Sequence, residues 1–190
     1  MRAAKAAGQR VTTEVCPHHL LLTDESCAGY DPNYKMNPPL RGKEDVAALL
    51  EGVRDGTIEC LVTDHAPHSF QDKELGFQEA PFGIIGLETA LGVALEVLVH
   101  SGRIPLERLI ALFTSEPARI IGWKGEQARG ALKPGYAGDV TIFHPEYPWT
   151  YDVKNSLSKG ANTPFSGRTF RGGPIVTIVG GEIAWKAPGF

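Results

Sequence analysis

Residues 58–68 constrain the fold of this chain more than any other segment, because a short apolar run ends abruptly in groups that carry chemistry. The apolar run lies between Gly56 and Pro67, which is the pattern of a buried strand. Polar residues follow directly, and a proline among them cannot donate to a sheet ladder, so we expect a loop there. In parallel α/β sheets and barrels, ligand-binding and catalytic groups gather at this carboxyl end of the strands.

The preceding segments predict a crossover unit of a parallel sheet. Residues 11–16 alternate β-branched and polar side chains, which indicates a strand. Residues 42–54 carry apolar positions at helical spacing, which predicts an amphipathic helix. Strand, loop, helix and strand in this order are typical of parallel α/β folds.

The rest of the chain changes character near residue 130. Residues 69–79 are predicted to be a polar loop over a site, residues 87–100 a mostly buried helix, and Pro105 and Pro117 mark further helical segments. Glycine-rich turns then separate three short β runs. We expect these runs to form a small antiparallel unit: 139–143, 174–179 and 182–185.

Composition favours small-molecule chemistry. The formal net charge is -3, the pI is near 6.1, and Lys and Arg are scattered, so no nucleic-acid footprint is present. No apolar run approaches the roughly 20 residues of a membrane span. The three cysteines show no Cys-x-x-Cys spacing, which predicts neither a disulfide framework nor a cysteine zinc site and fits a reducing cytoplasm.

Asp64, with His65 and His68, is the sharpest candidate site. Asp64 could ligate a metal or act as a general base, and a nearby histidine could ligate, shuttle protons or bind a carbonyl. Equally, Asp64 could cap the loop while the histidines bond to backbone. A catalytic zinc ion normally takes three protein ligands, so this segment alone does not decide between the two interpretations.

Other polar residues receive more modest interpretations. If His18 and His19 lie on extended backbone, they point to opposite faces and cannot easily share a metal. Asn37 stands before two prolines, which suits a positioned hydrogen-bonding group, although an ordinary turn residue is the alternative. We expect core or structural roles for Cys16, Cys60, His100 and His144.

Five motifs in order resemble the carboxyl-terminal half of the dihydroorotase family, which is related to hydantoinases and allantoinases. The resemblance covers essentially the whole chain, and several ordered motifs make it specific. The motifs are Glu-Val-Cys-Pro-His-His-Leu at 14–20, Asn-Pro-Pro-Leu-Arg at 37–41, Thr-Asp-His-Ala-Pro-His at 63–68, Gly-Leu-Glu-Thr-Ala-Leu at 86–91 and Lys-Gly-Ala-Asn-Thr-Pro-Phe at 159–165.

The resemblance implies an α/β fold, the carboxyl-terminal part of a (β/α)8 TIM-type barrel (about strands 7–8 and their helices) followed by a small β unit. Residues 1–122 would form the partial barrel, and residues 123–190 would form part of a small β-sandwich-like unit. The family's other metal ligands, including a His-x-His pair, have no counterpart here. We therefore expect unpaired strand edges and uncovered apolar helix faces.

The resemblance also implies a site with one or two zinc ions, where an activated water attacks a cyclic amide carbonyl. Asp64 would be the metal ligand and would carry the proton from the water to the leaving nitrogen. His18 and His19 would not be ligands. Substrate contacts would come from Asn37, His68, Pro81, Phe82 and Gly83.

The function implied is dihydroorotase: zinc-dependent reversible hydrolysis of dihydroorotate to N-carbamoyl-L-aspartate in pyrimidine biosynthesis, in the cytoplasm. The chain alone is expected to be inactive because most metal ligands are missing. One alternative is an allantoinase or hydantoinase-type fragment. Another is a non-catalytic, dihydroorotase-like scaffold partner of a transcarbamoylase. A homodimer is the other assembly expected, with no nucleic acid or membrane partner.

Overall fold

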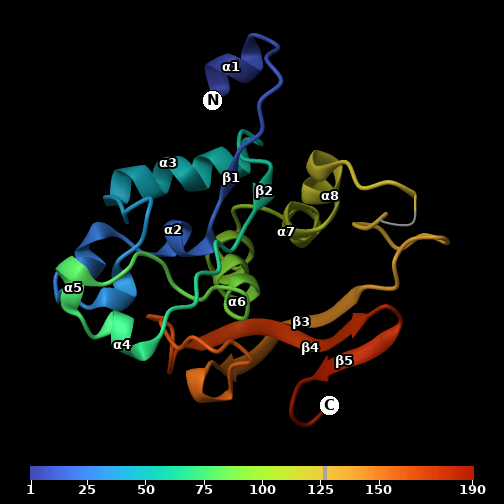
Figure 1. Cartoon of the computed structure of the whole chain (residues 1–190). Coiled ribbons are helices and arrows are strands. Elements are labelled where there is room, and N and C mark those ends of the chain that lie inside the picture. Colours follow the sequence, from blue (N-terminus) through green and yellow to red (C-terminus); the bar gives the residue numbers. More distant parts are fainter. Residues whose placement is uncertain (126–127) are drawn as a thin grey trace.

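A two-stranded parallel sheet lies near the centre of the molecule with helices around it, and a three-stranded antiparallel sheet lies below these helices in Figure 1. The computed structural model describes residues 1–125 and 128–190. Strand β1 (Glu14–Val15) pairs with β2 (Cys60–Leu61), and Val15 lies opposite Leu61. Helix α3 (Lys43–Arg54) connects the two strands, so the predicted crossover unit is confirmed, although both strands are shorter than expected.

Helix α3 forms where its sequence predicts it and packs tightly on the segment before β2. Two carboxylates in its first turn complement the helix dipole. Gly52 permits a close contact, because a Cβ there would lie 3.1 Å from Ile58 Cδ1, which is tighter than ordinary van der Waals packing. The central core therefore joins strands and helices; its buried members are Val15, Leu20, Val53, Ile58, Leu61, Ala94, Leu95, Val97, Leu98, Ile104, Leu109 and Leu112.

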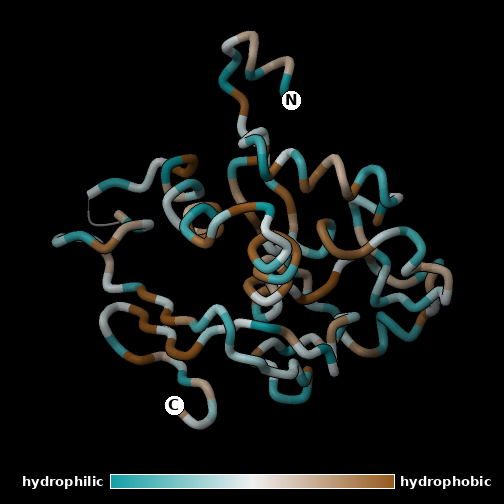
Figure 2. Tube along the Cα trace, turned by 180° about the vertical axis from the view of Figure 1, so that it is seen from behind, coloured by the Kyte–Doolittle hydropathy of each residue, from teal (hydrophilic) through white to brown (hydrophobic). Residues whose placement is uncertain are grey.

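Helix α6 (Ala90–Ala94) continues into a π-helical segment, η3 (Leu95–Val99), and both pack against the antiparallel sheet. The predicted helix at 87–100 is thus confirmed, with a later start and a wider final turn. A Cβ on Gly92 would lie 2.8 Å from the Phe170 ring, so glycine lets the helix approach the antiparallel sheet closely. Figure 2 shows apolar residues both in the central helices and along the strands of the antiparallel sheet.

The carboxyl-terminal helices also follow the sequence pattern. Helix α7 (Leu106–Phe113) begins directly after Pro105, and α8 (Ser115–Ile121) ends at Gly122, whose φ of 78° is left-handed. Buried leucines of α7 join the central core.

The antiparallel sheet has the order β3 (Val140–Thr150), β4 (Thr169–Val179), β5 (Glu182–Lys186). The three β runs are confirmed, and β3 and β4 are longer than predicted because bulges let pairing continue past His144–Pro148. A short 3-10 helix, η5 (Val153–Asn155), follows β3. Aromatic side chains of β4 and the preceding loop anchor a second core cluster with Ile84 and Val93.

Short helices occupy much of the segments between strands. The amino-terminal α1 (Arg2–Ala6) stands apart from the body in Figure 1. Residues 69–79, predicted to be a loop, contain α4 (Phe70–Lys73) and α5 (Gly76–Glu79), because Ser69 caps α4 through its side chain. The others are α2 (Pro17–Leu21), η1 (Asp24–Cys27) and η2 (Pro32–Tyr34).

Within residues 1–125 and 128–190, no helix has the length and apolar character that crossing a bilayer requires.

Candidate active site

Asp64 lies three residues beyond β2, where the chain turns away from the sheet. Its φ is 47°, an uncommon value for a residue with a Cβ, although aspartate tolerates it better than most. The turn packs against the start of the α6 region, since a Cβ on Gly86 would lie 2.9 Å from Thr63 O. Asp64 is exposed, and no described residue donates a hydrogen bond to its carboxylate, so the cap interpretation does not hold.

His65 is held by backbone. Its Nδ1 accepts hydrogen bonds from Gly86 N at 3.1 Å and Leu87 N at 3.4 Å. Because both partners are donors, Nδ1 carries no hydrogen, and Nε2 holds the ring proton. The structural interpretation is thus correct for His65, which leaves an N–H donor on its other edge.

His68 is fixed at two points. Its backbone N–H donates to Asn162 Oδ1 at 2.9 Å, and its ring Nε2 donates to Phe82 O at 2.8 Å. A carbonyl can only accept, so the proton is on Nε2 and Nδ1 keeps a free lone pair. His68 therefore offers an oriented acceptor beside residues 81–83.

Asn162 organises this region and was not singled out from sequence. It is buried, and its side-chain Nδ2 donates to Ala66 O at 2.8 Å and Gly83 O at 3.1 Å. Its Oδ1 accepts from His68 N, and its backbone O accepts from Ile85 N at 3.0 Å. The motif at 159–165 is the only sequence signal that contains it, and the motif alone assigns it no role.

Residues 81–83 form the rim facing His68. Gly83 has a φ of 109°, and a Cβ there would lie 2.6 Å from Ala66 Cβ, so only glycine fits without displacement. Pro81 O accepts a hydrogen bond from the buried Lys73 Nζ at 2.9 Å. Phe82 is exposed, with Lys35 Nζ 4.6 Å from its ring centroid.

Asn37 belongs to a segment that contacts the same rim. Lys35 O accepts from Gly83 N at 2.9 Å, and Pro38 O accepts from His19 Nε2 at 2.9 Å. The side chain of Asn37 is exposed between these two anchors. The structure thus links His68 and residues 81–83 directly and Asn37 through Lys35, whereas no hydrogen bond joins Asp64 to any of them.

His18 and His19 lie differently from the expectation. They belong to helix α2, with ring centroids 4.3 Å apart, so the assumption of extended backbone with opposite faces was wrong. Pro17 occupies the first turn of a helix, which is a start signal. One donor atom each from Cys16, His18 and His19 lie within 4.8 Å of one another, the sole metal-ligating group of three found among the described residues.

Burial governs the titration of this cluster. It lowers the pKa of His18 to about 3, with His19 adding to the effect, so the ring is neutral. It also raises the pKa of the Cys16 thiol to about 12, assisted by the carboxylates of Asp64 and Glu14. Asp64 therefore lies within electrostatic reach of the cluster.

Asp64 fits one ligand position of a zinc ion, because its carboxylate is exposed and takes no hydrogen bond from a described residue. One carboxylate does not complete such a site. His65 Nδ1 and His68 Nε2 are engaged with backbone, as described above.

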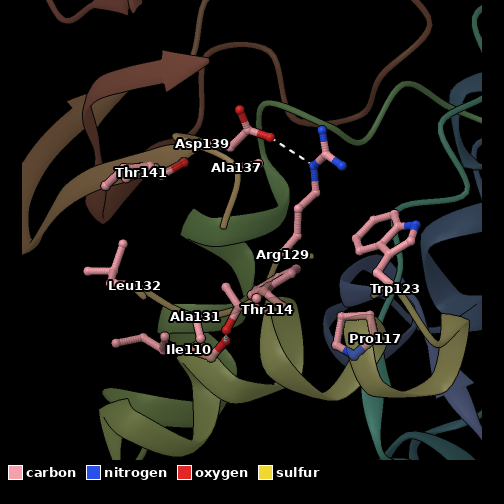
Figure 3. A pocket seen from close by; sticks show the side chains of 13 residues that line it. Ile110, Thr114, Pro117, Trp123, Arg129, Ala131, Leu132, Ala137, Asp139 and Thr141 are labelled. Atoms are coloured by element: carbon pink, nitrogen blue, oxygen red, sulfur yellow. Dashed lines mark hydrogen bonds and ion pairs between the residues drawn. The ribbon is translucent and has the colours of Figure 1, made fainter. Parts of the chain in front are cut away.

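A separate groove lies between α7, α8 and β3 (Figure 3). Its volume is about 510 Å³, and an ion pair between Arg129 and Asp139, 2.8 Å apart, stands at its wall. Trp123 and Leu132 contribute apolar surface. None of the residues that the sequence predicts to bind metal or substrate lines this groove.

The chain belongs to the amidohydrolase family, whose model matches residues 5–184. It is 51% identical over 186 residues to a dihydroorotase of Bacillus cereus and 48% identical over 186 residues to a dihydroorotase of Endomicrobium trichonymphae. Each alignment covers 98% of this chain, but only 42% and 43% of those relatives. The chain thus spans less than half their length.

Solved hydantoinases share the fold. The L-hydantoinase (dihydropyrimidinase) of Arthrobacter aurescens matches with a TM-score of 0.88 at 32% identity, and the dihydropyrimidinase of Brevibacillus agri matches with 0.87 at 25%. Both alignments cover 97% of this chain and 41% of the other. The structure is therefore a hydantoinase-like α/β fold.

Proposed function

We propose that this chain forms one wall of a cyclic amide hydrolase site, and that the substrate is dihydroorotate. The observation that carries the proposal is the hydrogen-bonded arrangement of His68, residues 81–83 and the Asn37 segment. His68 follows four residues after the exposed Asp64, whose carboxylate accepts no hydrogen bond from a described residue. The dihydroorotase relatives support this choice of substrate. The parallel β1 and β2 would be the last two strands of a barrel, in residues 1–122, and residues 123–190 would form the adjoining β unit.

The side chains have separable roles in this proposal. A bound zinc ion would supply a Lewis acid and an activated water. Asp64 would hold the ion through one oxygen and carry a proton on the other to the leaving ring nitrogen. His68 Nδ1 would accept a hydrogen bond from the substrate, the Asn37 amide would bind its polar edge, and the backbone at residues 81–83 would line the pocket.

The chain alone should not turn over substrate, because Asp64 is the one metal ligand that the proposal assigns to it. Purified chain with added zinc and dihydroorotate should therefore show no hydrolysis. Robust turnover that disappears in Asp64→Ala would contradict this part of the proposal.

A chimera tests the substrate. The aligned segment of the Bacillus cereus dihydroorotase would be replaced by this chain, and turnover of dihydroorotate, hydantoin and allantoin compared. We expect hydrolysis of dihydroorotate only. Preference for hydantoin, to which the structural relatives point, would favour the second candidate function instead. A folded chimera inactive on all three would favour a non-catalytic scaffold.

A further inference from the structure

A cluster of soft donors lies just after β1 and has no role in the proposed function. It consists of Cys16, His18 and His19, whose donor atoms lie within 4.8 Å of one another. Cys16 is the N-cap of α2, and Pro17 begins the helix, so the first turn brings the three side chains together. We propose that these three residues bind a thiophilic divalent ion such as Zn²⁺ or Cd²⁺, without using Asp64.

The first argument is that the cluster is open to an ion. His18 is 5% exposed, and neither its ring nitrogens nor the Cys16 sulfur has a hydrogen-bond partner among the described residues. The His18 nitrogens are not sealed from solvent, because the fully buried side-chain nitrogen without a partner among these residues is Arg168 Nε. An ion can therefore bind His18 and Cys16 without displacing an existing hydrogen bond.

The second argument is the state of the histidines. His19 Nε2 donates to Pro38 O at 2.9 Å, which leaves Nδ1 as its only available lone pair. A backbone carbonyl that fixes the tautomer in this way is the usual support of a metal-binding histidine. No described residue hydrogen-bonds the His18 ring, so one of its nitrogens can also ligate.

The third argument is chemical. One sulfur and two imidazoles suit zinc, and zinc bonds of about 2.0 to 2.3 Å place tetrahedral donors about 3.3 to 3.8 Å apart. The donor atoms lie within 4.8 Å of one another, so binding requires them to approach by about 1 Å, with water as the fourth ligand. Binding converts the Cys16 thiol to thiolate and releases its proton to solvent. The nearby Asp64 and Glu14 carboxylates favour a dication there.

Cobalt(II) titration of the purified chain tests the proposal, because cobalt bound to thiolate gives a charge-transfer absorption in the near ultraviolet. We expect a band that saturates at one equivalent. It should disappear in Cys16→Ser, and His18→Gln should weaken binding by at least about tenfold, since loss of a mere supporting partner already costs that much. Circular dichroism would verify folding of each variant.

Two controls keep the result specific. Cys60→Ser removes another buried thiol, and Asp64→Asn removes the carboxylate of the proposed active site. Both should keep the band, so failure of the proposed function leaves this result unaffected. If Cys16→Ser does not fold, His19→Gln replaces it, with the same expected weakening of at least about tenfold. Absence of a band in the wild type, or a band that survives Cys16→Ser, would overturn the proposal.

Discussion

Gly83 shows how one residue shapes the rim beside His68. Its φ is 109°, and a Cβ would lie 2.6 Å from Ala66 Cβ. Gly83→Ala should therefore combine backbone strain with overpacking. Gly102→Ala is the matched control, because Gly102 has a φ of 73° with open space around it, and should cost about 1 to 2 kcal/mol. We expect Gly83→Ala to cost about 1 to 3 kcal/mol more in urea unfolding. Equal losses would show that the close contact is unimportant.

Asn162 makes a second prediction at the residue scale. Asn162→Ala removes three side-chain hydrogen bonds that join residues 66, 68 and 83, so it should lower the free energy of unfolding by about 2 to 4 kcal/mol. Asn155→Ala, at an exposed position, should cost under about 0.5 kcal/mol. Comparable losses for both variants in denaturant unfolding would contradict the central position of Asn162.

Local sequence predicts the position of some site residues but not of others. The exposed carboxylate of Asp64 follows from a strand ending in a polar turn, which the pattern predicts. Asn162 bonds to His68, which lies 94 positions away in sequence, and no local pattern carries such information. The helical position of His18 and His19 is predictable from sequence, since Pro17 is a helix-start signal.

At the scale of elements, α1 is attached to the body by ion pairs. Lys5 Nζ lies 2.7 Å from Glu59, and this pairing, with Thr13 N and Arg119, holds the pKa of Glu59 below its ordinary value of 4.5. A lowered carboxyl pKa contributes stability above 4.5, and the contribution is lost as pH falls toward the lowered value.

Glu59→Gln should therefore be less stable than the wild type by up to about 1 kcal/mol at pH 7. The difference should shrink below pH 4.5 as Glu59 becomes protonated in the wild type. Unfolding at several pH values measures it, with Glu74→Gln, at an exposed position, as the control. A difference that persists unchanged in acid would show that the carboxylate charge is not responsible.

The sequence predicts most of the longer helices and the strands. It does not predict the short helices or the π-helical turn. Helix α3 and the β1–α3–β2 crossover follow from the spacing of apolar residues, because those residues must face the core. Helices α4 and α5 were not predicted, because four-residue helices are too short to show apolar periodicity, and only α4 has a side-chain cap, from Ser69. The π-helical turn at η3 contacts both β4 and α7, and the sequence carries no local signature of it.

At the scale of the molecule, the parallel sheet of the described residues has two strands, so each keeps one open edge. Open edges template further pairing, and we expect association that rises with protein concentration in sedimentation velocity. Thr12→Lys places a charge beside β1 and should reduce it, as charges on natural edge strands do. A monomer at every concentration would show that these strand edges do not mediate association.

The central claim is that Asp64 carries the proton in a cyclic amide hydrolase site. The most direct test is kcat/KM for dihydroorotate in the chimera described above, with and without Asp64→Asn. Asparagine keeps the size and one oxygen of the side chain but cannot accept the proton. We predict a loss of about 10² to 10⁴-fold, carried by kcat. An Asp64→Asn chimera that retains wild-type kcat/KM would contradict the account.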